Sequence, residues 1–297
     1  MDYAEAAKLA TVSFGNSVKL LAQQETSLLE NTVMVQSGLK GRSAVAADFV
    51  GEFPTKQVTS RLRDTPLEDI SRMRRWMEYR MYDGAVPIDK MDKLNTSYEP
   101  TDGLVQAAVA AYKRDIDFEV VRGFFAENVT GEYREGKTAF PAAHNIAVSG
   151  SGTNAMLYGI EDALEGLKQN KVKVASEQIF CVVDSRGAKK LRSEGIYINA
   201  DYMDNKVLTG SKLTPYAGVN FVEYEGCPTY KNSSGKTVHR YPVYCKSGVA
   251  VGKWDNLFTD ISQRTDKSYA WQVYASYALG ATRLEEAKCF CLEFTEA

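Results

Sequence analysis

The segment 145–155 is the part of this sequence that comes nearest to a cofactor-binding motif. Gly150-x-Gly152-x-x-Ala155 follows a strand-like run and precedes a helix-like run, and Asp184 ends the next strand-like run. Glycines in such a pattern let backbone amides approach a pyrophosphate at the amino end of a helix. The corresponding chemistry would be the binding of a nicotinamide dinucleotide.

Three features weaken this dinucleotide interpretation. Asp184 lies 32 residues after Gly152, whereas the acidic residue of the motif lies about 20 residues on. No further alternation of strands and helices continues a doubly wound sheet, and the motif begins in the middle of the chain. A Ser/Gly turn that leads into a helix explains the same residues more simply.

Other catalytic patterns are incomplete. Ser233-x-x-Lys236 matches the first box of serine penicillin-recognising enzymes, but no Ser-Asp-Asn or Lys-Thr-Gly box follows it. His144 and His239 have no evident nucleophile and acid to form a triad with. The sequence therefore predicts no catalytic residue and no enzyme activity.

The inventory of metal ligands is poor as well. There are only two histidines, and the five cysteines are scattered without a C-x-x-C pair: Cys181, Cys227, Cys245, Cys289 and Cys291. An odd, unpaired set of this kind is typical of a reducing cytosol and argues against a zinc site. We expect no metal and no cofactor.

Overall charge gives no reason to expect tight binding to nucleic acid. The chain has 36 basic and 38 acidic residues, a net charge of −2, so any contact with DNA must come from local patches. Near-neutrality also favours association between copies. The amino terminus is not a signal peptide, and no segment reaches the roughly 20 apolar residues of a membrane span.

Residues 1–37 are predicted to form an amphipathic helical arm. Apolar residues recur there at spacings near three and four, at Leu9, Val12, Val18, Leu21, Leu28 and Leu29. Two interpretations remain open, a first core helix or an arm that reaches a neighbouring subunit.

Residues 38–85 are predicted to form an extended β-ribbon. Strand-like pieces at 44–53, 56–62 and 74–82 flank a turn-rich stretch. Seven basic residues lie between positions 56 and 80, against four acids: Lys56, Arg61, Arg63, Arg72, Arg74, Arg75 and Arg80. A solvated strand face explains such a charge run in a compact monomer. A long ribbon with little core beneath it is only marginally stable alone, so the alternative is that a partner molecule covers it. Its positive charge suggests that this partner is an acidic surface on another copy.

Residues 102–127 form the strongest predicted helix, rich in alanine and free of proline. Its length would be about 40 Å. Residues 128–150 are predicted to be loop, 153–170 a second helix, 178–184 a buried strand followed by a short helix, and 196–260 a mixed lobe of short strands and turns. The last residues alternate in polarity as strands do, with a turn predicted at 280–283.

Several blocks together resemble the major capsid proteins of tailed double-stranded-DNA bacteriophages. Residues 38–79 look like their extended loop, with Asp64-Thr-Pro66 and the Arg74-Arg75 pair. Residues 86–94 and 102–127 resemble the entry to the peripheral domain and its spine helix. Residues 178–184 and 199–203 are similar to the axial domain, and 280–287 to the returning strands.

The resemblance implies an α+β fold, the Hong Kong phage type or Johnson fold. It implies an arm (1–37), an extended loop (38–85), a peripheral domain (86–150) with its spine helix, a mainly axial part (151–258) and returning peripheral strands (259–297). The seven basic residues of the ribbon become candidate contacts between subunits.

The function implied is that of a virion shell assembled from hexamers and pentamers around packaged double-stranded DNA. The implied partners are other copies, a separate scaffolding protein, a portal, and DNA contacted weakly and without sequence specificity; cement proteins stay open. Assembly would take place in the bacterial cytoplasm. Two alternatives remain, an encapsulin-like non-viral shell and the dinucleotide-binding enzyme. Some relatives cross-link a loop lysine, and Lys56 has the right residue type, but no partner is identifiable.

Overall fold

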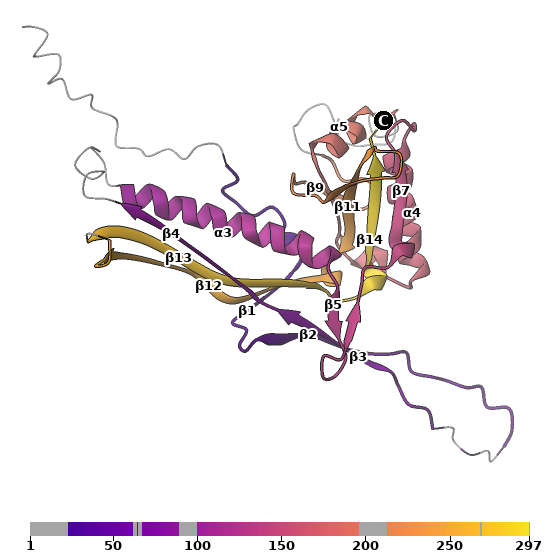
Figure 1. Ribbon diagram of the computed structural model, residues 1–297. Coiled ribbons are helices and arrows are strands. Elements are labelled where there is room, and N and C mark those ends of the chain that lie inside the picture. Colours follow the sequence, from indigo (N-terminus) through magenta and orange to yellow (C-terminus); the bar gives the residue numbers. More distant parts are fainter. Residues whose placement is uncertain are drawn as a thin grey trace, which may run out of the picture. The chain divides into compact units, whose positions relative to one another are not determined.

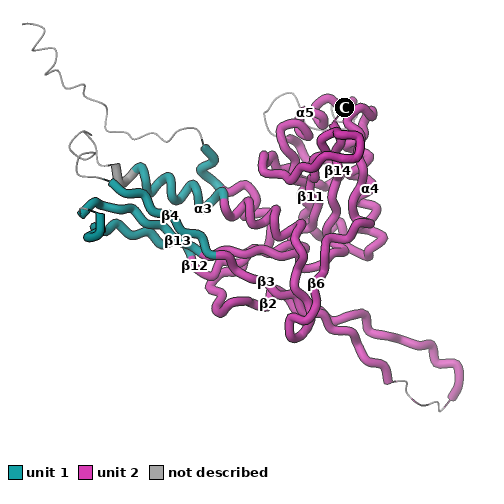
Figure 2. The backbone as a smooth tube through the Cα atoms, viewed as in Figure 1, with its two compact units in different colours: residues 1–26, 81–114, 256–277 teal, residues 27–80, 115–255, 278–297 magenta. Residues whose placement is uncertain are grey.

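The structure is a computed structural model that describes residues 23–61, 64, 67–88, 100–195, 213–267 and 269–296. Figure 2 shows the chain divided into two compact units. Unit 1 comprises residues 1–26, 81–114 and 256–277, and unit 2 comprises residues 27–80, 115–255 and 278–297.

The largest sheet lies in unit 2 and has six strands in the order β7-β14-β11-β8-β9, with β10 paired to β11. These strands are β7 (Asn145–Ser149), β8 (Ile179–Val183), β9 (Val219–Glu223), β10 (Thr229–Lys231), β11 (Thr237–Cys245) and β14 (Cys289–Thr295). β8 and β11 are buried along most of their length, as expected for strands with neighbours on both edges and side chains packed on both faces.

Two helices pack against this sheet, α4 (Ala155–Gln169) and α5 (Ser185–Ser193), as Figure 1 shows. The buried side chains of α4 recur at helical spacing: Met156, Leu157, Ile160, Ala163, Leu164 and Leu167. Gly159 faces the side chains of Val148 and Leu292, so α4 lies close to the sheet there.

A second sheet in unit 2 has four strands in the order β2-β3-β5-β6. They are β2 (Ser43–Val50), β3 (Arg72–Glu78), β5 (Asn128–Thr130) and β6 (Gly136–Thr138). β2 and β3 pair antiparallel from Ser43 opposite Glu78 to Val50 opposite Arg72. The ladder closes with a 2.7 Å hydrogen bond from the Gly51 amide to the Ser71 carbonyl.

A third sheet has the order β1-β12-β13-β4. Its strands are β1 (Met34–Ser37), β4 (Arg80–Ile88), β12 (Val249–Arg264) and β13 (Ala270–Arg283). Inside unit 1, Tyr277 of β13 stacks on Tyr82 with ring centroids 5.4 Å apart, and Tyr112 meets Tyr277 edge-on at 5.0 Å. These aromatic contacts form the packed centre of that unit.

The long helix α3 spans Pro100–Phe125, so the predicted helix at 102–127 is confirmed to within two residues. Its side chains Ile116, Val120 and Phe124 are buried, whereas Val109 is exposed. Short 3₁₀ turns complete the described secondary structure: η1 (Glu30–Thr32), η2 (Ala142–His144), η3 (Val174–Ser176), η5 (Lys246–Gly248) and η6 (Glu286–Lys288).

The predicted helical arm differs from the structure wherever it can be compared. Residues 1–22 lie outside the described part of the chain. Beyond them the chain forms the η1 turn and then β1, which pairs parallel with β12 from Met34 opposite Ala250 to Ser37 opposite Lys253. The amides of Leu28 and Leu29 donate to the Asp117 carboxylate instead of to carbonyls of a helix, so these contacts outweigh the helical spacing, which is a weak local preference.

Three further local predictions are wrong. Within the described residues of 51–71 no strand is assigned, because the chain there has no neighbouring strand beyond the Gly51–Ser71 bond. Residues 128–150 are not simply loop but contain β5, β6, η2 and β7. Residues 280–283 are not a turn, since β13 runs through them to Arg283.

Candidate assembly interface

The extended loop is the segment 51–71 between β2 and β3. Three of its described apolar side chains are exposed: Phe53 by 77%, Val58 by 69% and Leu67 by 95%. Figure 1 shows the loop leaving the ends of β2 and β3. Apolar side chains gathered on a projecting segment mark a surface that another molecule covers.

The charged side chains of this region are mostly exposed. Lys56 forms an ion pair with Glu68 inside the loop. In the ladder below it, Arg74 lies opposite Asp48, with Nε 2.6 Å from Oδ1, and this hydrogen bond lowers the pKa of the Asp48 carboxyl. Such exposed pairs add little to stability because solvent screens them.

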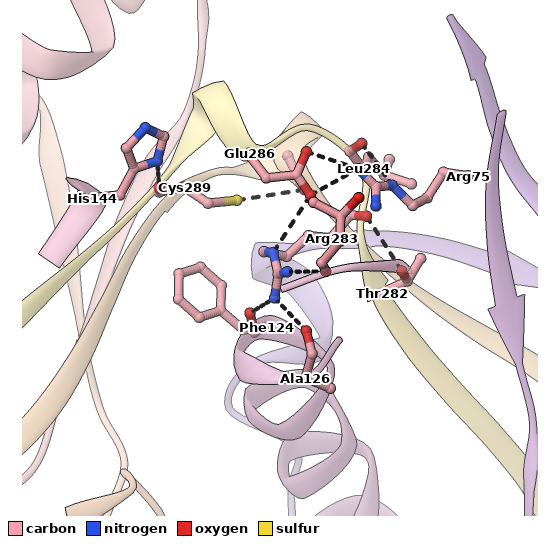
Figure 3. Close-up of polar contacts among 11 residues, drawn as sticks. Arg75, Phe124, Ala126, His144, Thr282, Arg283, Leu284, Glu286 and Cys289 are labelled. Carbon is pink, nitrogen blue, oxygen red and sulfur yellow. Dashed lines mark hydrogen bonds and ion pairs between the residues drawn. The ribbon is translucent and has the colours of Figure 1, made fainter. Parts of the chain in front are cut away.

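Arg75 differs from the other basic residues of the ribbon because its side chain is fully buried. Its Nη2 donates to both carboxylate oxygens of Glu286 at 2.7 Å, and its Nε donates to the Leu284 carbonyl at 3.3 Å. The guanidinium is therefore engaged within its own chain (Figure 3). We remove Arg75 from the set of candidate contacts between subunits.

A second buried arginine lies beside this pair. Arg283 donates hydrogen bonds to the carbonyls of Phe124 and Ala126, the latter at 2.8 Å, and to Thr138 at 3.2 Å. The last carbonyls of a helix have no partners within it, so Arg283 completes the carboxyl end of α3 (Figure 3). Burial lowers the pKa of Arg283 from its usual value.

We call Arg75, Arg283 and Glu286 the arginine junction. It joins β3, which is the root of the extended loop, to the end of α3, to β6 and to the connection between β13 and β14. Removing one member of a buried, hydrogen-bonded charge group is strongly destabilising. The junction therefore fixes the base from which the loop projects.

Backbones approach closely around this junction. A Cβ on Gly280 would lie 2.2 Å from the carbonyl oxygen of Glu78, and a Cβ on Gly123 would lie 2.6 Å from backbone atoms of Ala281. Glycine at position 123 lets α3 pack directly on the backbone of β13. Glycine at position 280 lets β13 pack directly on the backbone of β3.

The remaining predicted contact residues have varied surroundings. Arg61, Arg72 and Arg80 are exposed, while Arg63 lies outside the described residues.

Arg283 and Glu286 were not predicted from the sequence. The available signal was a single arginine at the end of the apolar run 277–284, where a charge must be buried and paired.

The amides of both glycines in the motif at 150–155 are engaged within the chain. The Gly150 amide donates to Thr295 at 2.8 Å and the Gly152 amide to Ser149 at 3.1 Å. The amides of Met156 and Leu157 at the start of α4 donate to the carboxylate of Glu194 at 2.9 and 3.1 Å. The chain's own carboxylate thus occupies the position that a phosphate would need.

Sheet order also disfavours the dinucleotide interpretation. β7 and β8, the strands before and after α4, are separated by β14 and β11. In a dinucleotide-binding unit the first two strands are adjacent and parallel. The pattern at Gly150 and Gly152 therefore serves to begin a helix.

Asp184 and the two histidines have structural surroundings. Asp184 accepts from the Gly187 amide at 2.8 Å, which caps α5, and from the Tyr241 hydroxyl at 2.6 Å. His239 lies between Asp184 and Glu296, with Nδ1 2.6 Å from the former and Nε2 3.1 Å from the latter. His144 stacks on Phe290. The contacts of Asp184 and His239 hold α5 and the end of β14 on the sheet, and the His144 contact holds the beginning of β14.

All five cysteines are buried and unpaired, and burial raises the pKa of Cys245 and of Cys291 to about 12. Such thiols are unreactive packing groups.

Among the described residues there is no group of three or more His, Cys, Asp or Glu side chains that could hold a metal ion. No helix in that part of the chain is long and apolar enough to cross a membrane.

Comparison with solved structures shows the fold. The capsid protein of Cyanophage Pam1 superimposes with a TM-score of 0.75 at 11% identity, over 100% of this chain and 99% of that chain. That of Cyanophage P-SCSP1u gives 0.72 at 17% identity, over 98% and 94%. That of Ralstonia phage GP4 gives 0.71 at 10% identity, over 97% and 96%.

Sequence comparison assigns the family. No curated protein sequence matches this chain. The family model described as "Phage capsid protein" matches residues 6–296, nearly the whole chain. The fold predicted from the family resemblance is confirmed, and the encapsulin-like and enzymatic alternatives are not favoured. This chain belongs to the phage capsid protein family and is a structural, shell-forming protein of the virion.

Proposed function

We propose that this protein is the major capsid protein of a tailed phage and that it builds the hexamers and pentamers of an icosahedral shell around double-stranded DNA. The observation that carries the proposal is the extended loop, which projects Phe53, Val58 and Leu67 into solvent from a base fixed by the arginine junction. A loop without its own core gains stability when a neighbouring subunit covers it.

Contacts of this kind support ring formation. The loop and the surface that receives it are different parts of the chain, so each subunit gives one contact and accepts another. Repetition around a closed ring makes an assembly of individually weak contacts stable. Exposed Lys56, Arg61 and Arg72 would set the orientation of docking through charge complementarity.

The finer assignments belong to the same proposal. Residues 38–85 act as the extended loop region, 86–150 and 259–297 as the peripheral domain, 151–258 mainly as the axial domain, and 1–37 as an arm. A separate scaffolding protein and a portal take part in assembly in the bacterial cytoplasm. DNA is contacted weakly and without sequence specificity, consistent with the net charge of −2.

Replacement of residues 52–70 by a short Gly-Ser linker tests the role of the loop. Because these residues add no strand to any described sheet, we expect the free energy of unfolding to stay close to that of the native chain. Shell formation, followed by light scattering and electron microscopy, should be abolished. Shells formed by the shortened chain at native concentration would contradict the proposal.

Charge reversal separates recognition from folding. The double variant Arg61→Glu with Arg72→Glu should assemble only at higher protein concentration and lower salt, since like charges oppose docking. The matched control is Lys231→Glu with Lys236→Glu, two exposed lysines near the ends of the β10–β11 turn, which makes the same change in net charge. Equal losses in both variants would show a general charge effect and refute a specific role for the loop.

A further inference from the structure

The turn between β5 and β6 holds an unusually exposed aromatic side chain. Tyr133, in the middle of residues 131–135, is 83% exposed. A tyrosine buries a large, rigid and amphipathic surface when it is covered, at a low cost in side-chain entropy. How well such a residue serves as an anchor depends on whether its turn is held in shape.

The first side of the turn is fastened to β3. The Gly131 amide donates to the Arg74 carbonyl at 3.1 Å, and the Gly131 carbonyl accepts from the indole Nε1 of Trp76 at 2.7 Å. The guanidinium of Arg74 lies 5.8 Å from the centroid of the Trp76 ring. Gly131 has a φ of +97°, a conformation that favours glycine.

The second side is fastened by two charged residues. The Tyr133 amide donates to the Glu135 carboxylate at 2.8 Å, and such backbone hydrogen bonds lower the pKa of that carboxyl. Arg134 has a left-handed φ of +68° and pairs with Glu78 at the end of β3. A strained, non-glycine conformation persists only where its surroundings hold it.

The turn is thus preorganised, and it presents Tyr133 outward at the root of the extended loop. Binding energy at protein interfaces concentrates in a few aromatic and arginine side chains, and rigid presentation lowers the entropy lost on binding. Beside Tyr133 lies the exposed carboxylate of Glu132. The surface of the turn thus combines an aromatic ring with a negative charge.

We propose that the β5–β6 turn is the receiving surface for the extended loop of a second copy of this chain, with Tyr133 as its anchor; this rests on the proposed function. The loop offers exposed Phe53, Val58 and Leu67 to the ring, and the exposed guanidinium of Arg61 to the carboxylate. The Tyr133 ring packs on the apolar side chains and the Glu132 carboxylate pairs with a loop cation. Because the two surfaces differ, the contact is head-to-tail, the type of contact from which closed rings are built when the rotation between copies closes.

The first test measures assembly. Tyr133→Ala should raise the protein concentration needed for shell formation about tenfold or more, whereas Tyr133→Phe, which keeps the ring, should stay close to the native chain. The matched control is Tyr158→Ala, which removes an exposed tyrosine from α4. Thermal melting of the unassembled chains checks that all variants fold. Native-like assembly of Tyr133→Ala would overturn the proposal.

The second test measures the contact itself. One batch of chain carries Val58→Cys and another carries Tyr133→Cys; the five native cysteines are buried and do not compete. When the two are mixed, assembled and oxidised, a disulfide-linked dimer should form on a non-reducing gel. The matched control pairs Val58→Cys with Tyr158→Cys and should give none.

The outcomes separate this inference from the proposed function. If shells form and the Val58–Tyr133 dimer is absent, the receiving surface is wrong while the shell function stands. If Tyr133→Cys links instead to an added scaffolding protein, the turn serves another partner and the inference is again overturned. If the native chain forms no shells under any condition, the proposed function itself fails.

Discussion

Buried carboxylates and guanidiniums in this chain hold the ends of helices and turns. Asp117, fully buried in α3, accepts from the Ser27 hydroxyl at 2.5 Å and from the amides of Leu28 and Leu29 at 2.9 Å each. Glu194 serves the start of α4 in the same way, and Arg283 serves the end of α3. Each satisfies backbone groups that a helix or a turn leaves without partners.

Replacing Arg283 should therefore be costly. Arg283→Met leaves the carbonyls of Phe124 and Ala126 without their donor in a buried place, and we expect a loss of at least about 3 kcal/mol in the free energy of unfolding. Arg283→Lys should be intermediate, because one ammonium cannot reproduce the fork of the guanidinium. Urea unfolding of the unassembled chain measures both.

The matched control is Arg264→Met. Arg264 is exposed and pairs with exposed Asp266 and half-buried Gln272, so its loss should change the free energy of unfolding by no more than about 0.5 kcal/mol. Equal effects at Arg264 and Arg283 would contradict the assignment of the arginine junction.

The burial of Glu194 predicts that the free energy of unfolding falls as pH rises. Burial raises the pKa of its carboxyl, against the opposing effect of the Met156 and Leu157 amides. A group that binds its proton more tightly in the folded state loses its contribution to stability as pH rises through the folded-state pKa. As pH rises from 4.5, the ordinary pKa of a glutamate carboxyl, toward neutrality, the native chain should therefore lose stability relative to Glu194→Gln.

Urea unfolding of both chains at a series of pH values measures this difference. The comparison concerns the slope with pH, because Glu194→Gln also weakens the hydrogen bonds to the amides of α4 by an amount that does not depend on pH. A difference between the two chains that stays constant, or that moves in favour of the native chain as pH rises, would contradict the assignment.

At the scale of elements, helices were easier to predict than strands. The predicted helices at 102–127 and 153–170 correspond to α3 and α4, because their periodicity and alanine content are local properties. β1 and the short strands β5 and β6 were missed, because a strand exists only through its neighbours. The strand predicted at 56–62 is not formed in the described residues, because no neighbouring strand pairs with that segment.

Gly123 tests the packing of α3 on β13. Glycine to alanine in an exposed helix stabilises it by about 0.5–1 kcal/mol. At Gly123 the added Cβ would lie 2.6 Å from the backbone of Ala281, so Gly123→Ala should instead destabilise the chain by about 1–3 kcal/mol. Thermal or urea unfolding of the unassembled chain shows whether the substitution stabilises or destabilises the protein.

Gly84 in β4 is the control for this change, because nothing lies within 4 Å of a Cβ added there. Gly84→Ala should leave the free energy of unfolding within about 0.5 kcal/mol of the native value. A stabilising effect of Gly123→Ala would show that α3 does not pack as closely on β13 as the structure has it.

At the scale of the whole molecule, the fold and family were predictable from blocks of residues that together resemble capsid proteins. The site was only partly predictable. The basic residues of the predicted ribbon 38–85 share a sequence signature, but burial separated Arg75 from the rest, and its partner Glu286 lies 211 residues away. The anchor proposed at Tyr133 carries no sequence signal, since its rigidity depends on Trp76, Glu78 and Glu135.

The central claim is that the chain functions by assembling with copies of itself. Electron microscopy of the purified chain, alone and with a candidate scaffolding protein, tests it most directly. We predict closed shells of uniform size built from hexamers and pentamers. A chain that remains monomeric by sedimentation and microscopy in both preparations would contradict the account.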